Sequence, residues 1–384
     1  MARGSGIAAA ALVAAVVVAS DGLGARADLP ARLSDTEFWA LIESTSEPNG
    51  YFRSDNIVSD EAIFAQVVPD LLQRRRSDGV YLGVGPEQNF TYIAALEPPM
   101  AFIIDIRRGN LHLHLLYKAL FELSADRAEF ISRLFVKPRP AGLGRTASAD
   151  AIIKAYWPIN TAEESTYRQR VAEVRDVLVT RHRLPLSDDD LRGIEYVYQA
   201  FYWFGPMINW ESSTARSISA SSRPSVADLL RQVDVSGREL SFLANVERFA
   251  FVKALQEKNL VVPVVGNFAG SRAVQAVGQY LREHSAQVGA FYVSEVEAYL
   301  VQDGLWPHYC RNLSTLPRHE RSVLIRPSLT GFGWPGPTIG VSPSLFATYS
   351  SKEAQLVPIA ADVAACAGRA SAPDESGDPR RPVR

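Results

Sequence analysis

Two glycines and an aspartate have the spacing of a small-molecule binding edge. Gly83 and Gly85 stand in the string Gly83-Val84-Gly85-Pro86-Glu87, directly after an apolar run, and Asp105 follows Gly85 by 20 residues. Glycines at such a corner let the backbone approach a ligand, and an acidic side chain at this spacing can accept hydrogen bonds from ribose hydroxyls. We therefore take Gly83, Gly85, Glu87 and Asp105 as candidate cofactor-binding residues. The alternative is purely structural, because a Gly-Pro corner also starts a helix and a strand-end aspartate often caps one.

The glycine pattern favours a nucleoside over a dinucleotide. Gln88 stands where the third glycine of a complete G-x-G-x-x-G motif would be. That motif places a pyrophosphate at the N-terminus of the following helix, so its loss weakens the case for pyrophosphate recognition. A nucleoside without a diphosphate, such as S-adenosylmethionine, fits this pattern better than NAD does.

Two other expected strand ends carry polar residues. Asn267 lies between two glycines in Gly266-Asn267-Phe268-Ala269-Gly270, and Glu295 follows Ser294 after the next apolar run. Glu295 would be suited to act as a base if burial raised its pKa. Otherwise it is a carboxylate stabilised by the dipole at a helix N-terminus. Asn267 and Glu295 are the candidate catalytic residues.

Other residue types argue against a metal site and against the commonest hydrolase motif. His112 and His114 are two positions apart in an expected helix, so they point about 200° apart and do not share an ion. His308 and His319 lie in expected loops without partners at ligand spacing, and no G-x-S-x-G string occurs. The polar stretch Phe52 to Glu61 either folds over the ligand edge as a lid or only satisfies its own backbone.

The apolar runs predict an α/β fold with a doubly wound, mostly parallel sheet. Residues 79 to 106 read as strand 80–84, helix 87–96 and strand 101–106. Later strands are expected at 260–265, 289–294 and 322–326, with helices at 239–257 and 271–284. Residues 28–78 are expected to form an N-terminal helical cap, in which Ser34 and Glu37 have capping-box spacing and Pro69 kinks or shortens a helix. A helical insertion at about 138–224 interrupts a Rossmann-like domain at 79–350.

The two ends of the sequence are expected to lie outside the fold. Residues 1–27 have a basic start, an apolar stretch and an Ala25-Arg26-Ala27 cleavage pattern, which predicts a signal peptide and an exported, periplasmic or secreted protein. About 13 apolar residues are too few for an uncleaved membrane anchor, and no later transmembrane segment is expected. Residues 369–384 have the composition of a disordered tail.

Composition places the chain among ordinary globular proteins. Of its 384 residues, 47% are hydrophobic and 21% charged, and the net charge is -2, which argues against a nucleic-acid partner. Cys310 and Cys366 are the only cysteines. They could pair in an oxidising compartment, or remain apart because Cys366 lies close to the expected tail.

Six strings together resemble a family of uncharacterised bacterial proteins whose Rossmann domain is similar to class I S-adenosylmethionine-dependent methyltransferases. The strings are, in order, EPNGYFRSDNIVSDE, GVYLGVGPEQNFTYIAAL, AFIIDIRRGN, LVVPVVGNFAG, FYVSEVEAYL and SVLIRPS, spread over roughly residues 37 to 328. The resemblance implies that Gly83, Gly85 and Glu87 form the glycine loop and that Asp105 holds the ribose. The chain departs from the family where Asn267 replaces an Asp and Glu295 an Asn.

The resemblance leaves two functions open. The first is a methyltransferase-like protein that binds S-adenosylmethionine or a related small nucleoside, with methyl transfer to an unknown acceptor. The second is an exported, non-catalytic binding or interaction protein on a degenerate methyltransferase fold, because an exported protein lacks the cytoplasmic supply of the methyl donor.

Overall fold

A single mixed sheet organises the part of the chain that the computed structural model describes, which is residues 1, 28–212, 223–327 and 354–370. Across these residues six strands pair in the order β3-β2-β1-β4-β5-β6. The first five strands in this order are parallel, and β6 is antiparallel to β5. Their bounds are β1 Gly79–Gly83, β2 Ala101–Asp105, β3 Val261–Val265, β4 Gln287–Tyr292, β5 Arg318–Pro327 and β6 Ala354–Pro358. The predicted α/β class and mostly parallel sheet are confirmed.

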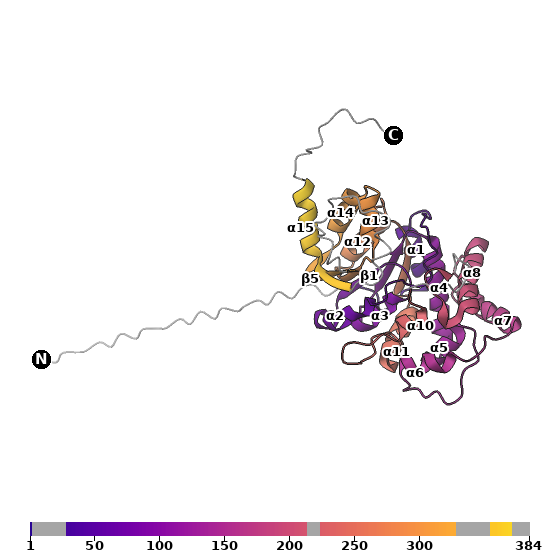
Figure 1. Ribbon diagram of the computed structural model, residues 1–384. Helices are drawn as coiled ribbons and strands as arrows, with labels where there is room; N and C mark the ends of the chain where they lie inside the picture. The colour runs from indigo at the N-terminus through magenta and orange to yellow at the C-terminus, as the bar shows by residue number, and fades with distance from the viewer. Residues whose placement is uncertain (2–27, 213–222, 328–353, 371–384) are drawn as a thin grey trace, which may run out of the picture.

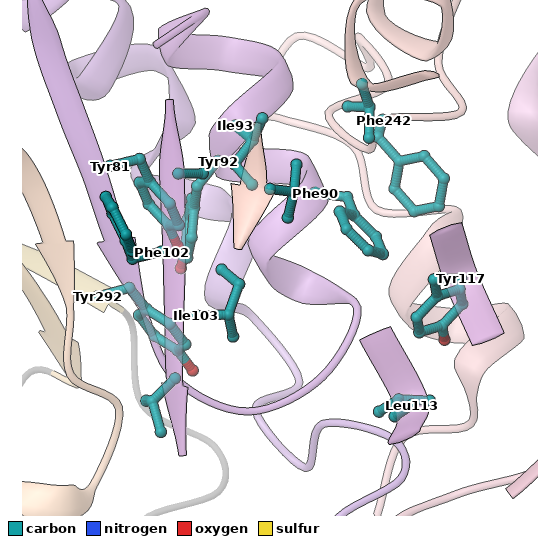
Figure 2. Close-up of a cluster of buried hydrophobic side chains, with 14 of the residues drawn as sticks. Tyr81, Phe90, Tyr92, Ile93, Phe102, Ile103, Leu113, Tyr117, Phe242 and Tyr292 are labelled. Atoms are coloured by element: carbon teal, nitrogen blue, oxygen red, sulfur yellow. The ribbon is translucent and has the colours of Figure 1, made fainter. Parts of the chain in front are cut away.

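The strands are buried because helices cover both faces of the sheet. Every residue of β1, β2 and β3 is buried, as near-continuous apolar runs in a parallel sheet require. Pro263 is tolerated within β3 because β3 is an edge strand of this sheet. Aromatic side chains fill the core around β1 and β2, and Figure 2 shows Tyr81, Tyr92 and Tyr292 gathered there.

Helices lie on opposite sides of the sheet in Figure 1. One group contains α12 (Ala273–Glu283), α13 (Val296–Gln302) and α14 (Trp306–Thr315), and the other contains α3 (Gln88–Leu96) and α4 (Arg108–Leu123). Helix α3 connects β1 to β2, and α4 in the crossover from β2 to β3 lies on the same face, whereas α12 connects β3 to β4 on the opposite face. This is how a doubly wound sheet is built.

The N-terminal segment packs against this sheet. Helix α1 (Asp35–Thr45) begins at Ser34, which forms the predicted capping box with Glu37, and it packs on β3 and α12. Of the two effects expected of Pro69, the structure shows a shortened helix and not a kinked one. The structure has a 3-10 turn η1 (Phe64–Val67) followed by a separate helix α2 (Val68–Arg74), because proline lacks an N–H and fits the first turn of a helix.

All the remaining helices before β3 lie between β2 and β3, and α8 packs along α4. The predicted helix at 239–257 is wrong at its start, because α11 begins only after Asn245, whose side chain caps it. Residues before it form an isolated bridge between Val233 and Glu239. The helices of this crossover are α4, α5 (Arg127–Leu134), α6 (Ala149–Tyr156), α7 (Glu164–Arg175), η2 (Asp176–Arg181), α8 (Asp188–Phe204), η3 (Gly205–Met207), α10 (Val226–Leu230) and α11 (Val246–Glu257).

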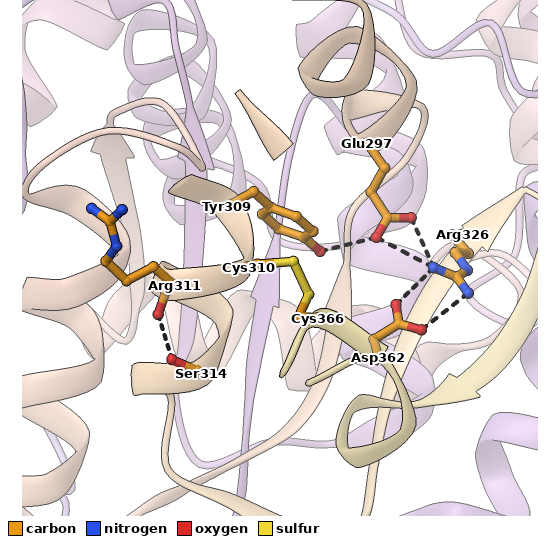
Figure 3. Close-up of a disulfide and its surroundings, with 8 residues drawn as sticks. All are labelled: Glu297, Tyr309, Cys310, Arg311, Ser314, Arg326, Asp362 and Cys366. Carbon is orange, nitrogen blue, oxygen red and sulfur yellow. Dashed lines mark hydrogen bonds and ion pairs between the residues drawn. A yellow bond between two sulfur atoms is a disulfide. The ribbon is translucent and has the colours of Figure 1, made fainter. Parts of the chain in front are cut away.

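A disulfide ties the C-terminal helix to the sheet layer. Cys310 of α14 is bonded to Cys366 of α15 (Ile359–Ala370), with Cα atoms 5.6 Å apart. Figure 3 shows the disulfide beside Arg326, which is paired with both Glu297 and Asp362. The cysteines therefore pair, and the expected tail at 369–384 overlaps the last two residues of α15.

Several expectations concern segments outside the described residues. These are the signal peptide apart from Met1, most of the loop at 212–224, the tail beyond residue 370 and residues 328–350 of the predicted domain. Among the described residues, no helix combines the length and apolar character needed to cross a membrane.

Candidate functional site

A pocket opens at the carboxyl ends of the parallel strands. It has a cavity volume of about 180 Å³, and its walls include residues that directly follow β1, β2, β3 and β4. The chain runs outward from β1 to β2 and β3 and then returns to β4 on the other side of β1. This reversal is the topological switch point, where ligands of open α/β sheets bind.

Gly85 forms part of the pocket wall, whereas Gly83 does not. Gly85 has a φ of 76°, which an L side chain rarely adopts, so glycine is required at this corner. Gly83 is required for packing instead, since a Cβ there would lie 2.0 Å from Oδ1 of the buried Asn89. The Asn89 amide in turn donates to the carbonyls of Val84, Gly85 and Pro86, which fixes the loop.

Asp105 lies at the end of β2 and faces the same pocket. Only 4% of its surface is exposed. Burial raises the pKa of its carboxyl, while Arg107 and the Gly85 amide act in the opposite direction. Oδ1 accepts the Arg107 amide at 2.9 Å, so the aspartate does cap the turn after β2. The capping and ligand-binding interpretations are therefore compatible, because the side chain also lines the cavity.

Asn267 lines the pocket at the end of β3, but a carboxylate of the chain itself occupies the helix start behind it. The Asn267 Oδ1 accepts the Ala269 amide at 2.8 Å. Glu47 accepts the amides of Arg272 and Ala273 at 2.7 and 3.0 Å and that of Asn267 at 3.1 Å. The glycine at 270 leaves room for this carboxylate, since a Cβ there would lie 2.3 Å from both its oxygens. The N-terminus of α12 is thus already satisfied by an internal anion.

Glu87 is buried behind the glycine loop and is absent from the pocket wall. Its Oε1 accepts the Ser59 amide at 3.4 Å, and its Oε2 has no hydrogen-bond partner among the described residues. Burial raises its pKa to about 7. His114, which the sequence placed in an expected helix and outside any metal site, contacts the same loop. Its Nε2 lies 2.9 Å from the Gly85 carbonyl oxygen.

Glu295 lines the pocket at the start of α13 and makes no helix-capping hydrogen bond. Burial raises its pKa to about 8, the carboxylates of Asp60 and Glu61 add to this shift, and Arg223 and Arg53 oppose it. A helix dipole would stabilise the ionised form and lower the pKa. The raised pKa therefore favours the alternative in which Glu295 exchanges a proton near neutral pH.

A buried hydrogen-bond network supports the end of β4. Glu61, 5% exposed, accepts from the hydroxyl of Tyr292 at 2.6 Å and from that of Ser294. Gln88 donates to the Tyr292 hydroxyl at 3.1 Å. Burial raises the pKa of Glu61 to about 7. Ser294 has a φ of 49°, an uncommon conformation for a residue with a side chain, and it is held there beside the pocket.

The segment Phe52 to Glu61 covers one side of the pocket. Phe52, Arg53 and Asp60 are among its lining residues, and Phe52 packs edge-on against Tyr299 of α13. The segment also bonds to itself, since the Ser59 hydroxyl accepts the Glu61 amide. Both interpretations made from sequence therefore hold in part, as the stretch satisfies its own backbone and forms a pocket wall.

The long crossover between β2 and β3 completes the wall. Arg223 pairs with Asp60 and lies over the ring of Trp210, at 4.8 Å from its centroid. Asp60 and Glu61 belong to the stretch that the sequence indicated could fold over the ligand edge, whereas Arg223 and Trp210 were not predicted as members of the site. Gln88 was noted only because it stands at the third glycine position.

Comparison with known proteins places the chain in a family without an assigned function. A family model described as "Domain of unknown function (DUF7790)" matches residues 57–357. These residues include most of the strand-end pocket, although Tyr51, Phe52, Arg53 and Asn56 of its wall precede them. No curated protein matches the sequence.

Proposed function

Because the chain belongs to the DUF7790 family, whose function is unknown, we propose a function from the pocket itself. We infer that this is a methyltransferase-like Rossmann protein that binds S-adenosylmethionine or a related small nucleoside at the strand ends and transfers its methyl group to an acceptor. The observation that carries the proposal is Asp105, a buried carboxyl that faces the pocket beside the positive-φ corner at Gly85.

The strand ends offer groups of the kind that a nucleoside requires. A carboxyl at the end of β2 can accept the two ribose hydroxyls, and a glycine after β1 lets the ligand approach the backbone. Asn267 and Phe268 follow β3 in the same wall, and they offer an amide edge and an aromatic face to a base. The order of the first five strands and the switch point between β1 and β4 also support a Rossmann-type arrangement.

The helix starts favour a ligand without a diphosphate. A pyrophosphate binds where helix N-termini present free amides. At α12 those amides are bonded to Glu47, and at α3 the buried Glu87 holds the N-cap position. At α12 an anionic diphosphate would meet the Glu47 carboxylate, so a nucleoside such as S-adenosylmethionine is the better fit.

S-Adenosylmethionine supplies an electrophilic methyl group, so alignment with an acceptor provides much of the rate and no strong nucleophile is required. The chain's own contribution is to orient the ligand through Asp105 and to hold or accept a proton at Glu295. That carboxyl lies at the β4 end of the pocket, away from the β2 end where the ribose would bind.

Calorimetric titration with S-adenosylmethionine and S-adenosylhomocysteine tests the proposal. We expect both ligands to bind the wild type, and Asp105→Asn to weaken binding by about 10-fold or more, as expected for losing hydrogen bonds to a charged acceptor. Asp70→Asn changes an exposed aspartate of α2 in the same way and should bind as the wild type does. If neither ligand gives a heat of binding with the folded wild type, the nucleoside proposal is wrong.

A second candidate function rests on the disulfide. Paired cysteines persist mainly in oxidising compartments, so the bond between Cys310 and Cys366 supports export and, with it, a non-catalytic binding protein on this fold. The mass of the mature chain tests export. We expect a product that begins at Asp28, and a cellular product that still begins at Met1 would remove this candidate.

A further inference from the structure

The buried polar atoms that lack a hydrogen-bond partner around the pocket are side-chain oxygens. Among pocket-lining residues that the structure describes, Gln88 and Glu295 carry buried side-chain atoms without a hydrogen-bond partner, and in both the atom is Oε1. The Gln88 amide is oriented by its neighbours, because the Tyr292 hydroxyl donates to Glu61 and must accept from Nε2. The Gln88 Oε1 is therefore an acceptor, and the Glu295 Oε1 is one when its carboxyl is ionised, a form that an adjacent cationic donor favours.

The charged residues of the pocket wall also favour a ligand that carries positive charge. Acidic lining residues outnumber the basic ones, with Asp60, Asp105, Glu295 and Asp303 against Arg53 and Arg223. Arg223 and Asp60 pair with each other, so their charges offset, and Arg53, the remaining arginine of the wall, donates to the Tyr299 hydroxyl and faces Asp105, Glu295 and Asp303. A cationic ligand is therefore favoured over an anionic one.

The same end of the pocket has apolar walls. Phe52 and Tyr299 meet edge to face with centroids 5.3 Å apart, and Trp210 and Leu300 line the cavity with them. These side chains suit an apolar or aromatic body that carries the cationic group.

We propose that the β4 end of the pocket binds a protonated amine on an apolar body, with its N–H groups directed at Glu295 and Gln88. Such an amine supplies donors to the two unpaired acceptors and positive charge to the acidic wall. The inference rests on the proposed function only in treating the pocket as a ligand site, and it makes this amine the second ligand, beside the nucleoside.

Binding of the amine is coupled to a proton. The Glu295 carboxyl has a pKa of about 8 because of its burial and the nearby Asp60 and Glu61, which outweigh Arg223 and Arg53. At pH 7 it is mostly protonated, and an adjacent ammonium favours its ionised form. Amine binding at pH 7 therefore releases about one proton to the buffer.

Calorimetry with benzylamine as the probe tests this, with benzyl alcohol as the uncharged match. Titrations at pH 7 in phosphate and in HEPES, which differ in ionisation enthalpy and contain no primary amine, count the protons released. We expect benzylamine to bind at least about 10-fold more tightly than benzyl alcohol and to release about one proton. The Glu295→Gln variant should lose both the preference for benzylamine over benzyl alcohol and the release of a proton. Glu283→Gln, an exposed carboxylate at the far end of α12, should retain both.

Equal binding of benzylamine and benzyl alcohol, or an unchanged proton release in a folded Glu295→Gln protein, overturns the inference. A further comparison identifies the source of the amine. If Glu295→Gln weakens S-adenosylmethionine but not 5′-methylthioadenosine, and benzylamine does not bind, Glu295 holds the ammonium of the nucleoside ligand and the separate amine is wrong. Benzylamine binding without any binding of S-adenosylmethionine would remove the proposed function and leave this inference standing.

Discussion

At the scale of single residues, Glu87 makes folding depend on pH. Its pKa is about 7 in the folded protein, above the ordinary value of 4.5, because the carboxyl is buried. Between these pH values the folded state holds a proton that the unfolded chain releases, so stability falls as pH rises from about 4.5 to 7 and stays lowered above. Over this pH range, we expect the free energy of unfolding of Glu87→Gln to fall by on the order of 3 kcal/mol less than that of the wild type.

Urea unfolding at pH 5 and pH 8 measures the effect of Glu87. The free energy of unfolding of Glu87→Gln should change less between the two pH values than that of the wild type, while the exposed Glu283→Gln should follow the wild type. An identical pH dependence in Glu87→Gln and the wild type would show that the Glu87 carboxyl is not held neutral by burial.

Residues of the site could be predicted from sequence where they follow a strand. Gly85, Asp105, Asn267 and Glu295 were found because the ends of parallel strands meet at one edge of a sheet. The stretch that ends at Glu61 was a candidate lid, but the contact of Glu61 with Tyr292 could not be predicted, because the two residues are 231 positions apart and no local pattern links them. Gly83 and Glu87 were expected at the ligand because loop spacing does not reveal which way the residues face.

At the scale of elements, His182 joins three parts of the chain. It follows η2 and contacts Asp35 of α1 through Nδ1 at 2.6 Å and Glu122 of α4 through Nε2 at 2.7 Å. The hydrogen bond with Glu122 raises its pKa above the ordinary 6.5. The stabilisation that protonated His182 gives the folded state is therefore fully present below about pH 6.5. It is lost as pH rises through the raised pKa of His182.

Replacement of His182 should loosen this junction in a pH-dependent way. We expect His182→Gln to lower the free energy of unfolding by about 1–2 kcal/mol at pH 6 and by less at pH 9. His308→Gln alters an exposed histidine and should have little effect at either pH. If His182→Gln lowers the free energy of unfolding equally at pH 6 and pH 9, the protonated ring is not what holds α1 to α4.

The elements themselves were predictable where their apolar runs were long. The unit from β1 to β2 agrees with its prediction to within a residue or so at each end. The start of α11 was placed too early because Leu240, Phe242 and Leu243 are buried in non-helical chain before Asn245, and apolar residues alone do not distinguish this from a helix. The 3-10 turn before Pro69 was not predicted, because it has no sequence signal of its own.

At the scale of the whole molecule, the disulfide anchors α15 to the rest of the structure. It links positions 56 residues apart, and removing such a bond costs about 2–4 kcal/mol. The double variant Cys310→Ser, Cys366→Ser should lose stability by this amount and lose amide-exchange protection in α15. Exchange in β1 and β2 should be retained, and unchanged protection of α15 would show that Arg326 and its partners hold the helix alone.

The central claim concerns what occupies the pocket at the strand ends. A crystal structure of the protein grown with S-adenosylhomocysteine tests it most directly. We expect the nucleoside in this pocket, with its ribose hydroxyls within hydrogen-bond distance of the Asp105 carboxyl and its adenine beside Asn267 and Phe268. An empty pocket at saturating ligand, or a nucleoside bound elsewhere on the molecule, would contradict it.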